Sequence, residues 1–280
     1  MTALSKKKIK RNLIIFITAT LLCGWIGVLV DHIIPGQVQG ESIGMTIWLI
    51  TPLLTAILLR IFGGDGWRDA RLLPRFRGNL KWYVISSLIF PIVTLVVSLL
   101  GSAIGWVDFS NFNLNILFRV FIGGLAINFI INFFEQSVWM GYLTSKLLNL
   151  NIKDLWLYVF VGSIWGLWHA PYYLVFLPDD LLYRVISVDR WVLVFGTIIV
   201  YIGWSIMFIE IYRITKSIWP LVLMHTVEDA WIESLIFGGQ IEIAQGREIF
   251  VSPWVGIITT LSFVLIGLVI RRYRLKKEQR

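Results

Sequence analysis

Seven acidic or histidine side chains fall inside long apolar segments of the chain, and they are the first residues that could do chemistry. They are Glu135, His169, Glu210, His225, Glu228, Asp229 and Glu233. An isolated ionised carboxylate is costly in hydrocarbon, so chains keep one there when it pairs, loses its charge or has a function. These residues are therefore the candidates for a buried polar site.

Four of these side chains are expected at similar depths in a membrane. A helix rises about 1.5 Å per residue, and on that scale Glu135, His169, His225 and Asp229 lie at overlapping heights. His225 and Asp229 are four residues apart, so they share one face of a helix. The sequence therefore predicts a single site between the fourth, fifth and seventh apolar segments. Pro171 further predicts a kink beside His169, because proline cannot donate to the carbonyl four residues earlier.

Hydrolysis is the chemistry that suits one carboxylate and two imidazoles. The carboxylate can take a proton from water, one imidazole can position that water, and the second can stabilise an oxyanion with a polar neighbour. The same atoms could instead bind zinc, because two histidines and a carboxylate leave a fourth position for water. The pattern of residues leaves both alternatives open.

The other ionisable residues have plainer interpretations. Glu210 and Glu233 lie near the ends of their segments, where we expect them to reach the interface or to serve packing. Glu228 lies on the flank of the His225 face and is also expected to be structural. The single cysteine, Cys23, has no partner for an intrachain disulfide, and a cysteine-based zinc site is excluded.

Composition and hydrophobic runs predict an all-α integral membrane protein. The 280 residues are 57% hydrophobic and only 15% charged, whereas about a quarter of the residues of a soluble domain are charged. Eight windows of about twenty apolar residues are long enough to span a bilayer. They fall near 12–30, 43–62, 80–100, 114–144, 154–176, 191–212, 217–237 and 253–270. The fourth is too long for one perpendicular span, so it tilts, kinks or projects. We expect one polytopic domain over 1–280, with its motif-bearing core at about 114–237.

The basic residues predict the orientation of the chain. Lys and Arg gather at 6–11, in the loop 60–81, after the fourth and sixth windows and in the tail 271–280. If eight helices cross the membrane, all these regions lie on the same side of it. By the positive-inside rule, that side is the cytoplasm. We therefore predict a multi-pass protein of the cell membrane with both termini in the cytoplasm. This pattern explains the net charge of +8, and we expect no nucleic-acid partner.

Three short motifs follow one another along the middle of the chain. They are EQSVWMGYL from Glu135, WGLWH ending at His169, and HTVED from His225 to Asp229. In order and spacing they resemble the CPBP (or Abi) family of CAAX-protease and bacteriocin-processing intramembrane proteases. The family pattern has two glutamates followed by arginine, an aromatic residue four before a histidine, and a histidine four before Asn or a similar residue.

The resemblance implies a role for each motif residue. Glu135 and His169 would activate the water, and His225 and Asp229 would stabilise the oxyanion. Three positions depart from the pattern: Gln136 replaces the second glutamate, Met140 the arginine, and Asp229 the common Asn. An ionised Asp229 would repel an oxyanion, whereas a protonated one could donate to it. Because 136 and 140 share a helical face, we interpret their coordinated change as the replacement of an ion pair by a neutral face.

The sequence thus predicts an intramembrane endopeptidase that uses a Glu/His-activated water. The resemblance implies peptide or membrane-protein substrates, such as prenylated C-termini or bacterial proteins linked to bacteriocin maturation or immunity. One alternative is a catalytically silent member that binds and regulates a membrane partner, which the changes at Gln136 and Met140 motivate. Another is a proton-coupled transporter, although no inverted repeat or pair of broken helices supports it.

Overall fold

The computed structural model describes residues 6–279, without the side chains of 184 and 185, and 75% of the structure is helical. Residues 1–5 and Arg280, whose cytoplasmic location was predicted, lie outside the described part. Two strands of two residues each, β1 (Val107–Asp108) and β2 (Glu242–Ile243), pair antiparallel. The prediction of an all-α integral membrane protein is confirmed at this level, because five helices are long and apolar enough to cross a membrane.

Helical structure occupies every apolar window named above. The α-helices are α1 (Lys6–Ile33), α2 (Ile43–Ile61), α3 (Leu80–Ala103), α4 (Leu114–Val138), α5 (Ser145–Asn149), α6 (Asp154–Trp168), α7 (Asp179–Val185), α8 (Arg190–Thr215), α9 (Trp219–Ile232), α10 (Glu248–Val251) and α11 (Ile257–Glu278). Three π-helical segments are η1 (Trp139–Thr144), η2 (Tyr172–Phe176) and η3 (Glu233–Phe237). The five candidate spans are Lys6–Ile33, Ile43–Ile61, Leu80–Ala103, Leu114–Asn149 and Arg190–Thr215. A count of eight spans stays a prediction.

The described residues form two compact units. Unit 1 contains the residues up to 71 together with 137–178 and 189–205, and unit 2 contains 72–136, 179–188 and the residues from 206 on. The division falls inside α4 and α8. A single domain over 1–280 stays a prediction, and the two units are described separately below.

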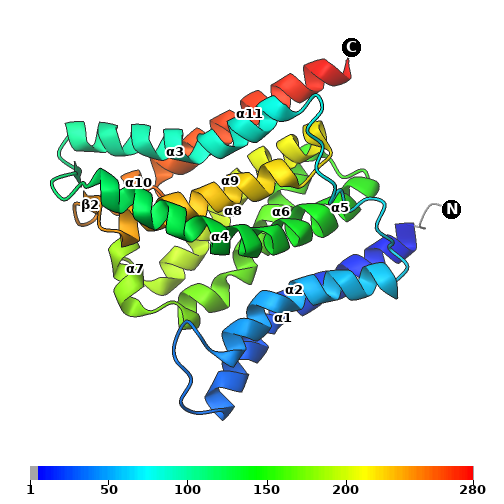
Figure 1. The fold of residues 1–280 in the computed structure, drawn as a ribbon. Helices are drawn as coiled ribbons and strands as arrows, with labels where there is room; N and C mark the ends of the chain where they lie inside the picture. Colours follow the sequence, from blue (N-terminus) through cyan, green and yellow to red (C-terminus); the bar gives the residue numbers. More distant parts are fainter. Residues whose placement is uncertain (1–5, 280) are drawn as a thin grey trace. The chain divides into compact units, whose positions relative to one another are not determined.

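In unit 1, glycines allow α1 and α2 to pack closely side by side, as the two blue helices of Figure 1 do. A Cβ on Gly27 would lie 2.3 Å from the carbonyl oxygen of Gly44, and a Cβ on Gly44 would lie 2.1 Å from that of Gly27. Real Cβ atoms do not approach a carbonyl so closely. Any larger residue at either position would therefore force the two helices apart.

Unit 1 also contains a network of buried charges that links the loop after α2 to the helical segment after α4. Arg60 donates to Asp69 Oδ1 at 2.8 Å and to the carbonyl of Gly141 at 2.6 Å. Lys146 Nζ lies 2.8 Å from Asp69 Oδ2. Burial alone would raise the pKa of Asp69, but the hydrogen bonds and charges of Arg60 and Lys146 bring that pKa below its ordinary value. The loop expected to be a basic cytoplasmic connection is thus anchored through its acidic residues.

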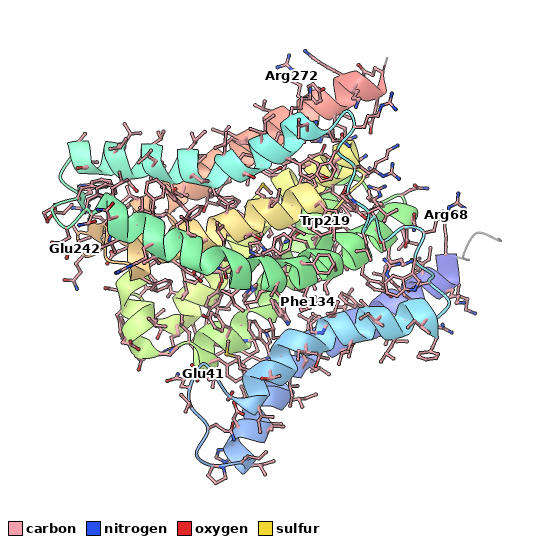
Figure 2. The ribbon with its side chains drawn as sticks, in the orientation of Figure 1. Glu41, Arg68, Phe134, Trp219, Glu242 and Arg272 are labelled. Carbon is pink, nitrogen blue, oxygen red and sulfur yellow. The ribbon has the colours of Figure 1, made fainter. Side chains whose placement is uncertain are left out.

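In unit 2, α3 contacts α9 and α11, and Figure 1 draws α3 beside α11. Glu210, on α8, is fully buried and pairs with Arg274 of α11, which agrees with the packing role that was one of its two expected roles. Arg274 Nε donates to Glu210 Oε2 at 2.5 Å and Nη2 donates to Oε1 at 3.3 Å. The neighbouring Arg272, by contrast, is exposed and points outward in Figure 2. A buried bidentate ion pair therefore joins α8 to α11.

Candidate active site

Three side-chain amides, spaced four residues apart on α4, meet three acceptors on the α9–η3 segment. The pairs are Asn128 with Glu233, Asn132 with Asp229, and Gln136 with His225. The acceptors are also spaced by four residues, and their order is reversed, so the two segments run antiparallel along this face. We call these three pairs the amide ladder. It fixes the register between α4 and α9 within unit 2.

The Gln136–His225 pair of the amide ladder is buried, and the Asn132–Asp229 pair is partly buried. Asn132 Nδ2 lies 2.5 Å from Asp229 Oδ2, and Gln136 Nε2 lies 3.1 Å from His225 Nδ1. The side chains of Asn132 and Gln136 are 0% exposed, and that of His225 is 4% exposed. Hydrogen bonds in such a low-dielectric setting are strong, and losing one partner is correspondingly costly.

Carboxyl groups crowd around His225. Glu228 Oε2 lies 4.0 Å from His225 Nε2, and Glu228 also shares a hydrogen bond with Asp229. A hydrogen bond between two carboxyl groups needs a proton on one of them. The charges of Glu135 and Glu233 are close enough to act on Glu228 as well. In unit 2, His225 and Asp229 therefore lie beside Glu228, and the charge of Glu135 reaches the same group.

His169 lies in unit 1, at the end of α6. The helix ends at Trp168, His169 caps it, and Pro171 precedes η2, so the predicted break in the helix at this proline is found. His169 Nδ1 lies 2.9 Å from the carbonyl oxygen of Trp165, and its Nε2 lies 3.1 Å from the hydroxyl of Tyr201. A carbonyl can only accept, so Nδ1 carries the proton and the Nε2 lone pair accepts from Tyr201.

Aromatic rings hold the His169 imidazole in place. The ring of Tyr201 stacks on it with centroids 4.6 Å apart and an interplanar angle of 14°, and the ring of Tyr173 stacks at 5.7 Å. The imidazole is 7% exposed. The convergence of His169 with Glu135, His225 and Asp229 into one site stays a prediction, since His169 belongs to unit 1 and the other three to unit 2.

Three residues that take part in these contacts were not predicted as site residues. They are Asn128, Asn132 and Tyr201. The amides carried a signal in the sequence, because they repeat every four residues on one helix just as His225, Asp229 and Glu233 do on another. Tyr201 carried no such signal, since one tyrosine in an apolar helix looks like any other. Glu228, interpreted as structural, is 2% exposed and takes part in the cluster.

A divalent metal would find ligands on the same face of α9. One ligand atom from each of His225, Glu228 and Asp229 lies within 4.8 Å of the others. One imidazole and two carboxylates are suitable donors for zinc, although zinc–ligand distances of about 2 Å would require these atoms to draw closer together. His225 would have to ligate through Nε2, because Nδ1 already pairs with Gln136. The predicted set of two histidines and a carboxylate is a different one, and it stays a prediction.

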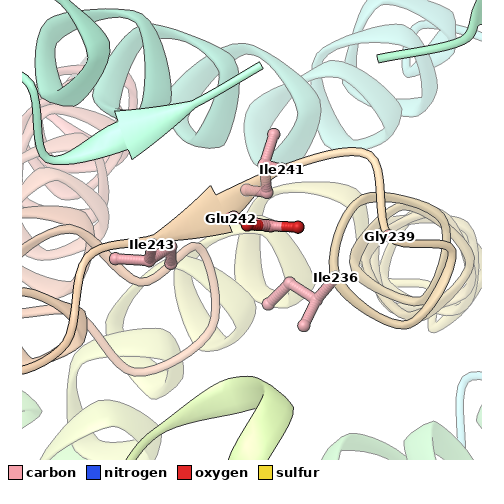
Figure 3. Close-up of a pocket in the computed structure, with 5 residues that line it drawn as sticks. All are labelled: Ile236, Gly239, Ile241, Glu242 and Ile243. Atoms are coloured by element: carbon pink, nitrogen blue, oxygen red, sulfur yellow. The ribbon is translucent and has the colours of Figure 1, made fainter. Parts of the chain in front are cut away.

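A pocket of about 330 Å³ lies elsewhere in unit 2, beside strand β2. Its lining residues are Ile236, Gly239, Ile241, Glu242 and Ile243, as Figure 3 shows. The Glu242 carboxylate accepts a hydrogen bond from Asn111 at 2.9 Å. None of the predicted catalytic residues is among these lining residues, so we do not assign the chemistry to this pocket.

The fold and the amide ladder together define an α-helical integral membrane protein with an ionisable cluster inside one of its units. Residues 117–231 match the family model described as Type II CAAX prenyl endopeptidase Rce1-like. The match contains all three motifs and supports the resemblance to the CAAX protease family described above. A comparison with curated proteins gave no match.

Proposed function

We propose that the protein is an intramembrane endopeptidase that hydrolyses a peptide bond with a water activated by Glu135 and His169. The match of residues 117–231 to a family model of CAAX endopeptidases supports a protease acting on peptides or proteins. In the proposed reaction Glu135 takes a proton from water, His169 positions that water through Nε2, and His225 with Asp229 stabilises the oxyanion. The same residues later return the proton to the leaving amine.

The observation that carries this proposal is the opposite hydrogen bonding of the two imidazoles. Trp165 accepts from Nδ1 of His169, so Nε2 of that ring is an acceptor, and it would orient water in place of the Tyr201 hydroxyl that it binds here. Gln136 pairs with Nδ1 of His225, so Nε2 of that ring faces the carboxyl cluster. One imidazole is thus arranged as an acceptor and the other as a partner of developing negative charge. A protonated Asp229 could also donate to an oxyanion.

The proposed substrate is a protein or peptide with a prenylated C-terminus, cleaved near the cytoplasmic half of the cell membrane. The family description motivates the prenyl group, and the distribution of Lys and Arg motivates the cytoplasmic placement of the site and of both termini.

Cleavage of a farnesylated CAAX peptide by the purified protein in lipid vesicles tests the proposal. Glu135→Gln and His169→Ala should each lower kcat by at least about 100-fold, because general acid–base groups contribute about 10²–10⁴-fold. Glu242→Gln, which changes an exposed carboxylate of the pocket beside β2, is the matched control and should cleave normally. Full cleavage by folded Glu135→Gln and His169→Ala variants would rule out the mechanism.

A second candidate is a catalytically silent member that binds and regulates a membrane partner. Met140, at the position of the family arginine, is 0% exposed and accepts a weak hydrogen bond from Thr144, so it fills a packed position without charge. A partner that co-purifies equally with the parent and the Glu135→Gln variant, with no cleavage by either, would favour this function.

A further inference from the structure

Gln136 stands where the family pattern has its second glutamate, and its contact differs in kind from any that an ionised carboxylate could make. The amide nitrogen of Gln136 lies 3.1 Å from His225 Nδ1. An NH₂ group can only donate, so Nδ1 must accept. A neutral imidazole has one proton, which must then lie on Nε2.

The surroundings of His225 favour the same arrangement. Its Nε2 lies 4.0 Å from Glu228 Oε2, where an N–H is attracted to the carboxyl oxygen and a bare lone pair would be repelled. The other two pairs of the amide ladder also have the amide nitrogen as donor, because both of their partners are carboxyl groups. Gln136 therefore continues a series in which α4 donates and the α9–η3 segment accepts.

We propose that Gln136 is a positioning residue that fixes His225 as its neutral Nε2–H form. A glutamate at this position has no proton to donate when ionised and would accept from Nδ1–H. Nε2 of a neutral ring would then be an acceptor, and it would donate only if the ring became an imidazolium. With Gln136, His225 offers a donor without carrying a charge.

The catalytic meaning of this proposal rests on the proposed function, since a neutral Nε2–H is the form that donates to an oxyanion. The form of the ring does not depend on that function. The proposal also bears on the metal alternative. A metal can bind Nε2 only if that nitrogen carries no proton, so the ring proton would have to lie on Nδ1. The side chain of Gln136 would then have to turn so that its oxygen accepts from Nδ1–H.

Nitrogen NMR of the full chain in lipid nanodiscs tests the proposal directly. The protein is labelled with ¹⁵N-histidine, and the signals of His225 are assigned by their loss in His225→Gln. We expect a pyridine-type Nδ1 and a pyrrole-type Nε2 in the parent. Gln136→Glu, which has the same shape, should move the proton onto Nδ1. Gln136→Met, which has similar length and no hydrogen-bonding group, should give a mixture of both forms.

Controls separate this effect from a general disturbance of the fold. Asn128→Leu removes another amide of the ladder without touching His225, so the His225 signals should stay as in the parent. The His169 signals report on folding in every variant. Protonated Nδ1 in the parent, or an unchanged His225 pattern in both Gln136 variants, would overturn the proposal. If Gln136→Met fails to fold, Gln136→Glu alone decides it.

Activity gives a second readout. Residues that orient a functional histidine at metal centres typically contribute about 10- to 100-fold, and we expect a fall in kcat of this size with unchanged KM for Gln136→Met. Cleavage that survives Glu135→Gln while His225 keeps the Nε2–H form would refute the proposed function alone. Loss of cleavage in Glu135→Gln, together with an Nδ1–H form in the parent, would refute the role of Gln136 alone.

Discussion

Replacement of Arg274 by methionine should destabilise unit 2 substantially, because it strands a buried carboxylate. Arg274 is 3% exposed, and its guanidinium makes two hydrogen bonds to Glu210, which is 0% exposed. A second cation, Arg213, lies 3.8 Å from Glu210 and remains in the variant. Arg274 also binds Glu278, but that carboxylate is largely exposed.

The expected size of the effect follows from these contacts. Breaking a buried ion pair costs about 3–5 kcal/mol, and we expect about 3 kcal/mol because Arg213 still compensates part of the charge. The lost pair with exposed Glu278 contributes about 0–1 kcal/mol and changes this figure little. The double variant Glu210→Leu with Arg274→Met leaves no stranded charge, so it should recover most of the loss, with a coupling of about 2 kcal/mol.

Unfolding of the purified protein in mixed detergent micelles, followed by tryptophan fluorescence, measures these free energies. The parent, both single variants and the double variant form one thermodynamic cycle. Arg272→Met is the matched control, because that arginine is exposed on the same helix, and it should change stability by less than about 0.5 kcal/mol. The reasoning is refuted if Arg274→Met costs no more than Arg272→Met, or if the double variant is no more stable than the single.

Four further predictions follow from the contacts described above. The lowered pKa of Asp69 means that its ionised form stabilises the fold at pH values above the ordinary aspartate pKa. This contribution should be lost as the pH falls through the lowered pKa, below about pH 4. The Asp69→Asn variant should therefore show a flatter dependence of stability on pH in that range. Asn132→Leu removes the donor to Asp229 and should cost about 1.5–3 kcal/mol in the same unfolding assay; a loss below 0.5 kcal/mol would contradict the contact. Tyr201→Phe keeps the ring stacked on His169 but removes the hydroxyl, so we expect a loss of about 1 kcal/mol and altered His169 nitrogen signals in NMR; an unchanged His169 spectrum would contradict this contact. Dialysis against a chelator should leave peptide cleavage unchanged if His225 keeps its Nε2 proton, and a loss that added zinc restores would argue for a metal.

The elements of the fold were largely predictable, because apolar runs of about twenty residues have few alternatives in a membrane. Each predicted window holds a helix, and the break at Pro171 follows from the missing N–H of proline. The π-helical segment η1 was not predictable from hydrophobicity. It begins at Trp139, so residue 140 lies in the π-helical segment and residue 136 lies in the α-helix before it. Because hydrogen bonds in a π-helix join residues five apart, positions 136 and 140 do not share a face as they would in a regular α-helix.

The partners of the predicted site residues depend on pairing between distant segments, which composition does not reveal. Gln136 was considered in relation to Met140 on its own helix, whereas its hydrogen bond goes to His225 across the interface. Glu210 was expected to reach the interface or to serve packing, and the sequence did not indicate that Arg274, 64 residues later, is its partner. Both partners were missed for one reason, since reasoning along a single helix cannot identify a partner on another.

The amide ladder also constrains how α9 could slide along α4. A displacement of one helical turn, about 5.4 Å, would bring Asn132 opposite His225 and Asn128 opposite Asp229, so two amides would again find acceptors. A shift of half that length would satisfy none of them. The interface therefore has separate favourable registers, one helical turn apart. Only in the observed register does Gln136 contact the imidazole of His225.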